Sequence, residues 1–239
     1  MTTPTYDGPL TGALGALQRR IVACDACPRL VEHRRRVAVT PPARHRGSAY
    51  WAAPVPGNGD PHARLLIVGL APASHGSNRT ARMFTGDPSA DFLTAALHRA
   101  GFASQPASRH RDGGLTLRGA FVTAAGRCAP PQDKPTPAEL AACRPFLAEE
   151  LRLLTKVRVV LALGRIAFDG YLRAVRQATG VDGIGRGLAF GHGVNHLLGE
   201  GLPALCCSYH PSPRNTNTGR LTASSLDAVL AAVRARLDA

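Results

Sequence analysis

Four short apolar runs recur along the chain, and polar stretches rich in glycine and proline separate them. The runs cover Arg64–Val68, Ala120–Ala125, Val157–Leu163 and Ala204–Ser208. Continuous apolar runs of this length, bounded by turn residues, are typical of strands that are buried on both faces of a parallel sheet. The pattern therefore predicts four buried strands.

Helical spacing of apolar residues occupies the segments between these runs. It predicts helices over residues 11–22 and 90–100, after Gly164, and over the C-terminal segment that contains Leu226–Leu237. Thr136-Pro-Ala-Glu139 is a capping box with proline at the first helical position, so a further helix should begin there. Strands that alternate with helices predict an α/β fold with a mostly parallel four-stranded sheet, in one domain over residues 1–239.

The stretch Gly69–Asp91 follows the first predicted strand directly and is too rich in functional side chains for a simple connection. Open α/β sheets place their sites at the carboxyl ends of strands. We therefore expect this stretch to form a pocket wall before a helix begins near Ser89. The polar and aromatic residues that it concentrates are His75, Asn78, Arg79, Arg82, Phe84 and Asp87.

The charge of the chain indicates what kind of partner it binds. The chain has 29 Lys+Arg against 16 Asp+Glu, a formal net charge of +13, so a polyanion such as nucleic acid is the expected partner. The basic run His33–Arg36 is either a solvated face or a phosphate contact. No run approaches the roughly 18 apolar residues of a membrane span, and Met1–Tyr6 lacks the pattern of a signal peptide. We expect a cytoplasmic monomer that does not bind membranes.

Four of the six cysteines form two pairs, each near a predicted helix end: Cys24 with Cys27, and Cys128 with Cys143. Four thiolates could hold a structural zinc or an iron–sulfur cluster, or they could be unrelated buried thiols. Cys206 and Cys207 are adjacent in a predicted strand and point to opposite faces, so they should be core residues. His192 and His196 are interpreted as loop residues, not as ligands.

The motifs together resemble the family 5 (type B) uracil-DNA glycosylases, and the resemblance covers nearly the whole chain. They are Cys24-x-x-Cys27, GLAPASHGSNRTARMFTGD, Arg127-Cys128-Ala-Pro-Pro followed by Cys143, and His210-Pro-Ser followed by Gly-Arg-Leu-Thr. The resemblance implies a three-layer α/β/α fold and excision of uracil and other deaminated bases from DNA. It also implies a 4Fe–4S cluster held by Cys24, Cys27, Cys128 and Cys143.

The same resemblance, combined with residue chemistry, gives a set of site residues. Phe84 is expected to stack on a flipped base, with a core phenylalanine as the alternative. His210 is expected to donate a hydrogen bond to the pyrimidine oxygen that becomes anionic, with a capping or structural histidine as the alternative. Gly69, Ala71 and Ala73 are small enough for the backbone to approach the base or sugar. The expected donors to DNA phosphates are Arg214, Asn215, Asn217 and Arg220.

Three positions depart from the patterns of related enzymes. Leu70 stands where family 4 enzymes carry an acidic residue, and Ala124 where they carry an asparagine that reads the edge of uracil, so base selection should be broader. Asp133 stands where family 5 members have an asparagine proposed to position the nucleophilic water. Asp133 could keep that role, or Asp87 could take it; Asp87 could alternatively serve as a turn or helix N-terminal residue.

A monofunctional glycosylase is the main hypothesis, since no lysine is evidently placed as a Schiff-base nucleophile. The alternative is a non-catalytic iron–sulfur protein that binds DNA or senses damage on the same fold. A third interpretation is a zinc-stabilised nucleic-acid module.

Overall fold

A single sheet forms the centre of the computed structural model, which describes residue 6 and residues 8–239. Within these residues the sheet has six strands in the order β1-β3-β2-β4-β6-β5. Their bounds are β1 Asn58–Gly59, β2 Leu65–Gly69, β3 Ala120–Ala124, β4 Val159–Leu163, β5 Asn195–His196 and β6 Ala204–Ser208.

The four longer strands confirm the predicted parallel sheet. Strands β3, β2, β4 and β6 pair in parallel, and every residue of β2, β3 and β4 is buried. Two short edge strands, β1 and β5, were not predicted and pair antiparallel with β3 and β6. Each has only two residues, too few for any periodicity, and each pairs with backbone groups that the edge would otherwise leave unpaired.

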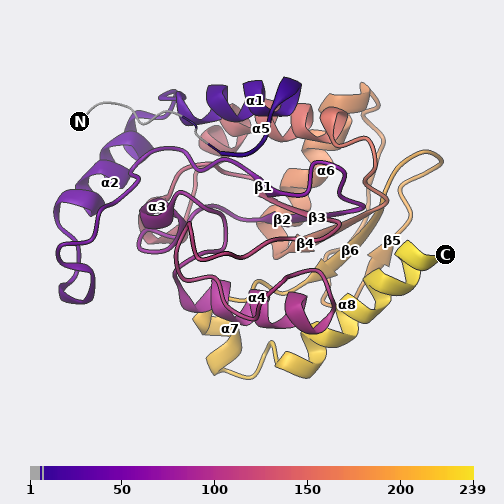
Figure 1. The fold of residues 1–239 in the computed structure, drawn as a ribbon. Coiled ribbons are helices and arrows are strands. Elements are labelled where there is room, and N and C mark those ends of the chain that lie inside the picture. The colour runs from indigo at the N-terminus through magenta and orange to yellow at the C-terminus, as the bar shows by residue number, and fades with distance from the viewer. Residues whose placement is uncertain (1–5, 7) are drawn as a thin grey trace.

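Helices cover both faces of the sheet, so the architecture is three-layered as expected (Figure 1). Helices α1 (Gly12–Val22), α5 (Pro137–Leu153) and α6 (Arg165–Thr179) pack on one face; α4 (Pro88–Arg99) and α8 (Ala223–Asp238) pack on the other. Alternate strand residues divide between the two cores: Cys206 lies in the α4–α8 core and Cys207 in the α1–α5–α6 core. Both are fully buried, which confirms that they are core residues.

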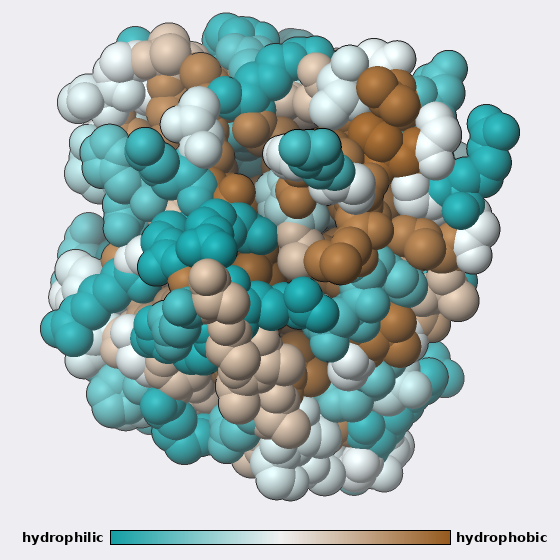
Figure 2. Space-filling model, turned by 90° about the vertical axis from the view of Figure 1, so that its right-hand side faces the viewer, coloured by the Kyte–Doolittle hydropathy of each residue, from teal (hydrophilic) through white to brown (hydrophobic). Residues whose placement is uncertain are grey.

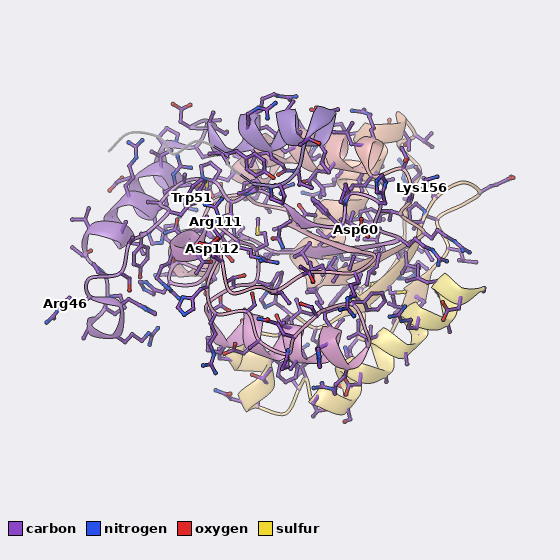
Figure 3. All side chains as sticks on the ribbon, in the orientation of Figure 1. Arg46, Trp51, Asp60, Arg111, Asp112 and Lys156 are labelled. Atoms are coloured by element: carbon purple, nitrogen blue, oxygen red, sulfur yellow. The ribbon has the colours of Figure 1, made fainter. Side chains whose placement is uncertain are left out.

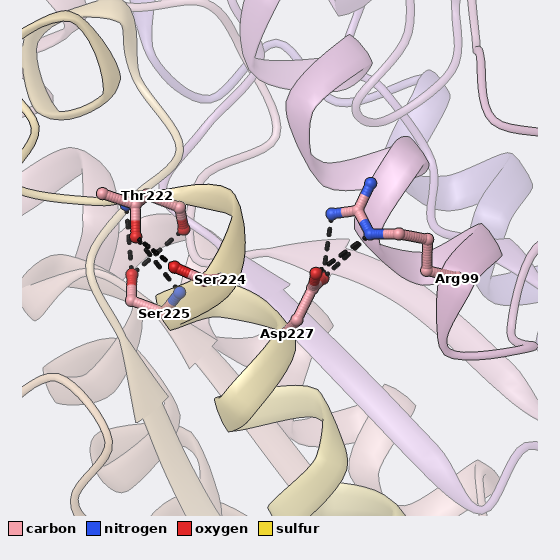
Figure 4. Close-up of polar contacts among 5 residues, drawn as sticks. All are labelled: Arg99, Thr222, Ser224, Ser225 and Asp227. Carbon is pink, nitrogen blue, oxygen red and sulfur yellow. Dashed lines mark hydrogen bonds and ion pairs between the residues drawn. The ribbon is translucent and has the colours of Figure 1, made fainter.

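Local signals explain where these helices begin. The capping box predicted at Thr136 and Glu139 is present at the start of α5. A second capping box, between Thr222 and Ser225, begins α8, and Asp227 one turn later forms an ion pair with Arg99 of α4 (Figure 4). These contacts fix α8 beside α4 at one end of that layer.

Two further helices lie near the carboxyl ends of the parallel strands. Helix α2 (Pro28–Val39) leads into the 3-10 helix η1 (Ala43–His45), and this segment extends away from the layers at the left of Figure 1. Helix α2 was not predicted, although Pro28 in its first turn is a helix-start signal. The short helices α3 (Ser77–Thr80), α7 (Pro213–Asn217) and η2 (Pro131–Asp133) also surround this edge.

The opposite side of the molecule is shown in Figure 2, where apolar side chains reach the surface between polar ones. No helix in the described part of the chain is both long enough and apolar enough to cross a bilayer. The expectation about a signal peptide concerns Met1–Tyr6, and of these residues the structure describes only Tyr6.

Candidate active site and metal centre

The carboxyl ends of the parallel strands bring the predicted site residues to one edge. Strand β2 ends at Gly69 beside Ala124 of β3, and the pairing continues past the strands: Ala125 N donates to Gly69 O at 3.0 Å and Gly126 N to Leu70 O at 2.9 Å. Ala124 is buried, and Leu70, Ala71 and Ala73 are half-buried. This edge is where open α/β sheets bind ligands.

Phe84 and His210 meet above Gly69. Their ring centroids are 5.9 Å apart with the planes tilted by 33°. The Phe84 ring lies so close to Gly69 that a Cβ at position 69 would be 2.7 Å from Phe84 Cε2, so any larger residue there would have to displace the ring. Phe84 itself has a left-handed φ of 48°, a strained conformation that is common at binding sites.

His210 is held by its surroundings as a neutral imidazole. Burial lowers its pKa to about 4. Gly164, with φ at 95°, leaves room for it, because a Cβ there would lie 3.2 Å from His210 Cβ. The Asn215 amide donates to the His210 carbonyl at 2.8 Å. At neutral pH, His210 can therefore donate one N–H without carrying a charge.

Other side chains of the Gly69–Asp91 stretch hold the loop together. Arg79 donates to the carbonyls of His75 at 2.9 Å and Gly86 at 3.1 Å, and Arg82 donates to Leu115 O at 2.7 Å. Asn78 is buried within α3, which interrupts the stretch. These three residues fix the shape of the pocket wall.

The two aspartates considered as water-holding residues differ in their surroundings. Asp87 is the N-cap of α4 and accepts from Ala90 N at 2.9 Å, as one of the sequence alternatives expected. Burial raises its pKa, and the charges of Asp91 and Asp133 act in the same direction. Asp133 is exposed on η2, where both it and Gln132 have a left-handed φ of 56°. The carboxylates of Asp87 and Asp133 are thus close enough to interact.

The expected phosphate donors lie on and after α7. Arg214 and Asn217 are exposed, and Arg220 stacks over the Tyr209 ring at 4.3 Å. Asn215 differs from the others, because its amide group already holds His210 O. It is better placed to position His210 than to contact DNA.

The two histidines that were interpreted as loop residues have structural contacts. His192 lies in the loop and stacks on Tyr209, with Nδ1 accepting from Tyr209 N at 3.3 Å. His196 lies in β5, so its placement in a loop was wrong, and its Nε2 is 3.0 Å from Ala189 O.

The two cysteine pairs meet although they are far apart in sequence. Cys24, Cys27, Cys128 and Cys143 line one small cavity between α2, α5 and the loop after β3. Cys128 and Cys143 are buried, and burial raises the pKa of the Cys128 thiol to about 12. In the described part of the chain, no three His, Cys, Asp or Glu side chains are placed so that together they could hold one metal ion.

Two buried guanidinium groups line the same cavity. Arg34 Nη1 donates to Cys128 Sγ at 2.9 Å, while Arg34 Nε has no partner. Arg127 pairs with Glu150 at 2.5 Å through Nη2, while its Nε and Nη1 have none. Buried cations with unused donors beside four thiols suit an anionic group ligated by thiolates. The donor set therefore fits an iron–sulfur cluster.

The sequence motifs contain Arg34 and Arg127, but they predict no role at the cysteine cavity for these two residues or for Glu150. Cys27 is the N-cap of α2, and Arg34 follows it by seven residues, or two helical turns, so Arg34 lies on the side of the helix that Cys27 begins. That signal was available in the sequence. Burial of Arg127 and Glu150 depends on distant segments, because Glu150 also accepts from Thr123 Oγ1 at 2.7 Å and from Gln18 Nε2 at 3.2 Å.

Comparison with known proteins assigns the class that this fold and site define. The model of the Uracil DNA glycosylase superfamily matches residues 56–234, from just before β1 into α8. A type-5 uracil-DNA glycosylase of Thermus thermophilus is 49% identical over 209 residues, covering 87% of this chain and 90% of the relative. Relatives of the same name are 48% identical in Mycobacterium tuberculosis (90% of this chain, 79% of the relative) and 44% identical in Pyrobaculum aerophilum (88% of each). The chain belongs to the type-5 uracil-DNA glycosylases of this superfamily, which confirms the resemblance found in the sequence.

Proposed function

We propose that this protein is a monofunctional DNA glycosylase that hydrolyses the N-glycosidic bond of uracil and other deaminated bases in DNA. The observation that carries the proposal is the contact between Phe84 and His210 above Gly69, at the carboxyl ends of β2 and β6. We propose that residues 1–239 act as one domain, as a cytoplasmic monomer that associates with the nucleoid through DNA.

A base within a duplex must be extruded before its glycosidic bond can be reached. Phe84 offers a ring on which the extruded base can stack, a contact worth roughly 1–3 kcal/mol. Carbon atoms in contact are about 3.5–4.0 Å apart, so a base does not fit between rings whose centroids are 5.9 Å apart. The base therefore stacks on Phe84 alone, and His210 meets its edge.

Hydrolysis breaks the N-glycosidic bond between the sugar and the base. The electron pair of this bond leaves with the base, and the oxygen of water bonds to the anomeric carbon. The sugar develops positive charge and the base negative charge. The neutral His210 N–H stabilises the base oxygen as it becomes anionic. Because Leu70 and Ala124 in the pocket wall have no side-chain groups that hydrogen-bond to a base, selection between bases should be weak. We therefore propose a substrate range broader than uracil.

We propose that Asp133 positions the attacking water. Its carboxylate is exposed and close enough to Asp87 to act on the pKa of that group, whereas one oxygen of Asp87 is already used to cap α4. A nearby carboxylate also stabilises the developing positive charge of the sugar.

Replacing Asp133 by alanine should lower the single-turnover excision rate by up to about 10²-fold, because the attacking water would no longer be held in position. Asp87→Asn is the matched variant: it keeps a capping side chain but removes the charge, and it should retain most of the rate. Rapid-quench measurement at saturating enzyme distinguishes them. Full activity of both variants would refute both water assignments, and loss only in Asp87→Asn would transfer the role to Asp87.

Excision itself is tested by incubating the protein with duplexes that carry uracil, hypoxanthine or other deaminated bases and then cleaving abasic sites with alkali. Strand breaks at the lesion are expected. Retention of the lesion duplex without breaks would support the non-catalytic DNA-binding alternative.

We further propose that Cys24, Cys27, Cys128 and Cys143 hold a 4Fe–4S cluster, with Arg34 and Arg127 offsetting its negative charge. When bound, such a cluster crosslinks the segments that supply its ligands. Here these are the connection between α1 and α2, the loop after β3, and α5. Its proposed role is to brace the loops around the site.

Protein prepared without oxygen should be brown and contain about four iron atoms per chain. Cys128→Ala should lose the colour and the iron, because one thiolate ligand is removed. Cys206→Ala is the control, since it removes a buried thiol of the opposite core and should keep both. A colourless wild type that contains zinc would contradict the cluster and favour the zinc alternative.

A further inference from the structure

A strongly basic segment lies beside the candidate site, and its exposed charges have no part in the chemistry above. We call residues 33–50 the basic lobe; it comprises most of α2, η1 and the chain that leads to Tyr50. These residues include five arginines and no aspartate or glutamate. Arg34 is buried against Cys128, whereas the other four are exposed: Arg35, Arg36, Arg44 and Arg46.

Direct contacts attach the basic lobe to the pocket wall. The Tyr50 hydroxyl is 2.8 Å from His75 Nδ1, and His45 stacks on the His75 ring at 5.8 Å. His33 Nε2 is 3.2 Å from Ser74 Oγ. Since Ser74 and His75 belong to the Gly69–Asp91 stretch, the lobe is held at a fixed place relative to Phe84.

Positive charge accumulates at this contact. The pKa of His75 is lowered first by burial and then by His45, Arg44, Arg79 and His33. His45 is likewise affected by burial, Arg79 and Arg44. The lowered pKa values keep both rings neutral at neutral pH, so the positive charge around them comes from Arg44 and Arg79, an arrangement that favours the approach of an anion.

We propose that the basic lobe is a second DNA-binding surface, which contacts phosphates on the side of the site opposite α7. Figure 1 shows α2 and α7 on either side of α3, and Figure 3 shows Arg46 at the outer end of the lobe, pointing into solvent. A duplex that presents its lesion to Phe84 passes between these two surfaces. The inference rests on the proposed function, because it takes DNA as the substrate.

The chemistry of the lobe favours a nucleic-acid backbone over an anionic membrane. Interfacial membrane binding needs an apolar face beside the charges. Among residues 33–50, all of which the structure describes, Val39 is the one large apolar residue with a strongly exposed side chain, at 66%. The lobe therefore lacks such an apolar face. Arginines spread over a helix and its following loop suit a row of phosphates.

The test is the salt dependence of duplex binding by the double variant Arg35→Gln/Arg46→Gln. Both residues are exposed, so the fold should persist. Each lost phosphate contact reduces the slope of log K against log salt by about 0.9, so the slope should become shallower by about 1.8. The single-turnover excision rate at saturating enzyme should stay unchanged, since neither residue touches the reacting atoms.

Lys156→Gln/Arg186→Gln is the control, because it removes the same charge from exposed positions elsewhere. Lys156 lies before β4, at the far end of the molecule from the lobe in Figure 3, and Arg186 follows α6. This variant should leave the slope unchanged. An unchanged slope in the lobe variant, or an equal change in both variants, would overturn the proposal.

Failure of this inference is distinguishable from failure of the proposed function. Binding is measured on a duplex whether or not the base is excised, so a wild type that binds without excising would overturn only the proposed function. Vesicles containing phosphatidylglycerol provide the last arm: lobe-dependent binding to them with an unchanged DNA slope would assign the lobe to a membrane and overturn the DNA proposal.

Discussion

Replacing His210 by alanine should lower the single-turnover rate of uracil excision about 10²–10³-fold, the usual loss when one donor to a developing anion is removed. His210 is placed for this by three contacts: Phe84 beside its ring, Gly164 beside its Cβ and the Asn215 amide on its carbonyl. The dissociation constant for lesion duplex should change much less, because the donor acts mainly on charge that forms in the transition state.

His62→Ala is the matched control, since His62 is an exposed histidine at the opposite edge of the sheet and should leave the rate unchanged. The pH profile gives a further check. Because burial holds the pKa of His210 near 4, its imidazole stays neutral above that value, and it should contribute no change in rate between about pH 5 and pH 8. Equal losses in rate and in DNA binding would instead make His210 a docking residue.

The largest effect on stability is expected from Glu150→Gln. Glu150 is fully buried and accepts from Arg127, Thr123 and Gln18. Glutamine keeps the shape but leaves the buried Arg127 guanidinium without its counter-charge, a change that typically costs about 3–5 kcal/mol. For a chain of this size, such a loss corresponds to a decrease in melting temperature of about 6–20 °C.

The neighbouring Glu149→Gln variant removes the same charge from an ion pair on the surface, so it tests whether the loss of stability depends on burial. Glu149 forms a bidentate pair with Arg20 on the surface, and exposed pairs contribute about 0–1 kcal/mol. Thermal unfolding followed by circular dichroism should therefore show little change for Glu149→Gln. Similar small decreases in both variants would show that the Arg127 charge is compensated by another group.

This network also connects the proposed metal centre to the sheet. Arg127 precedes Cys128, and its carbonyl accepts from Val55 N at 2.7 Å. Thr123 belongs to β3, whose last residue is Ala124 of the site. Glu150→Gln should therefore also reduce retention of iron, which the iron assay described above would measure in the same preparations.

The sequence by itself determined the local features. The four buried strands, the α5 capping box, and the alternative for Asp87 as a helix N-terminal residue all depend on residues within a few positions of one another. Apolar periodicity and capping chemistry are encoded at that range. The burial of Cys206 and Cys207 on opposite faces of the sheet followed from the alternation of side chains along a strand.

Only the tertiary structure decided which polar groups are buried together. Arg34 and Arg35 are adjacent and chemically identical, yet one donates to Cys128 inside the protein and the other is exposed. Asn215 and Asn217 divide in the same way, between the His210 carbonyl and solvent. The contact of Phe84 with His210 joins loops after β2 and β6, which are far apart in sequence. Such choices depend on the packing of distant segments, because burial of a polar group is favourable only where a partner from elsewhere in the chain meets it.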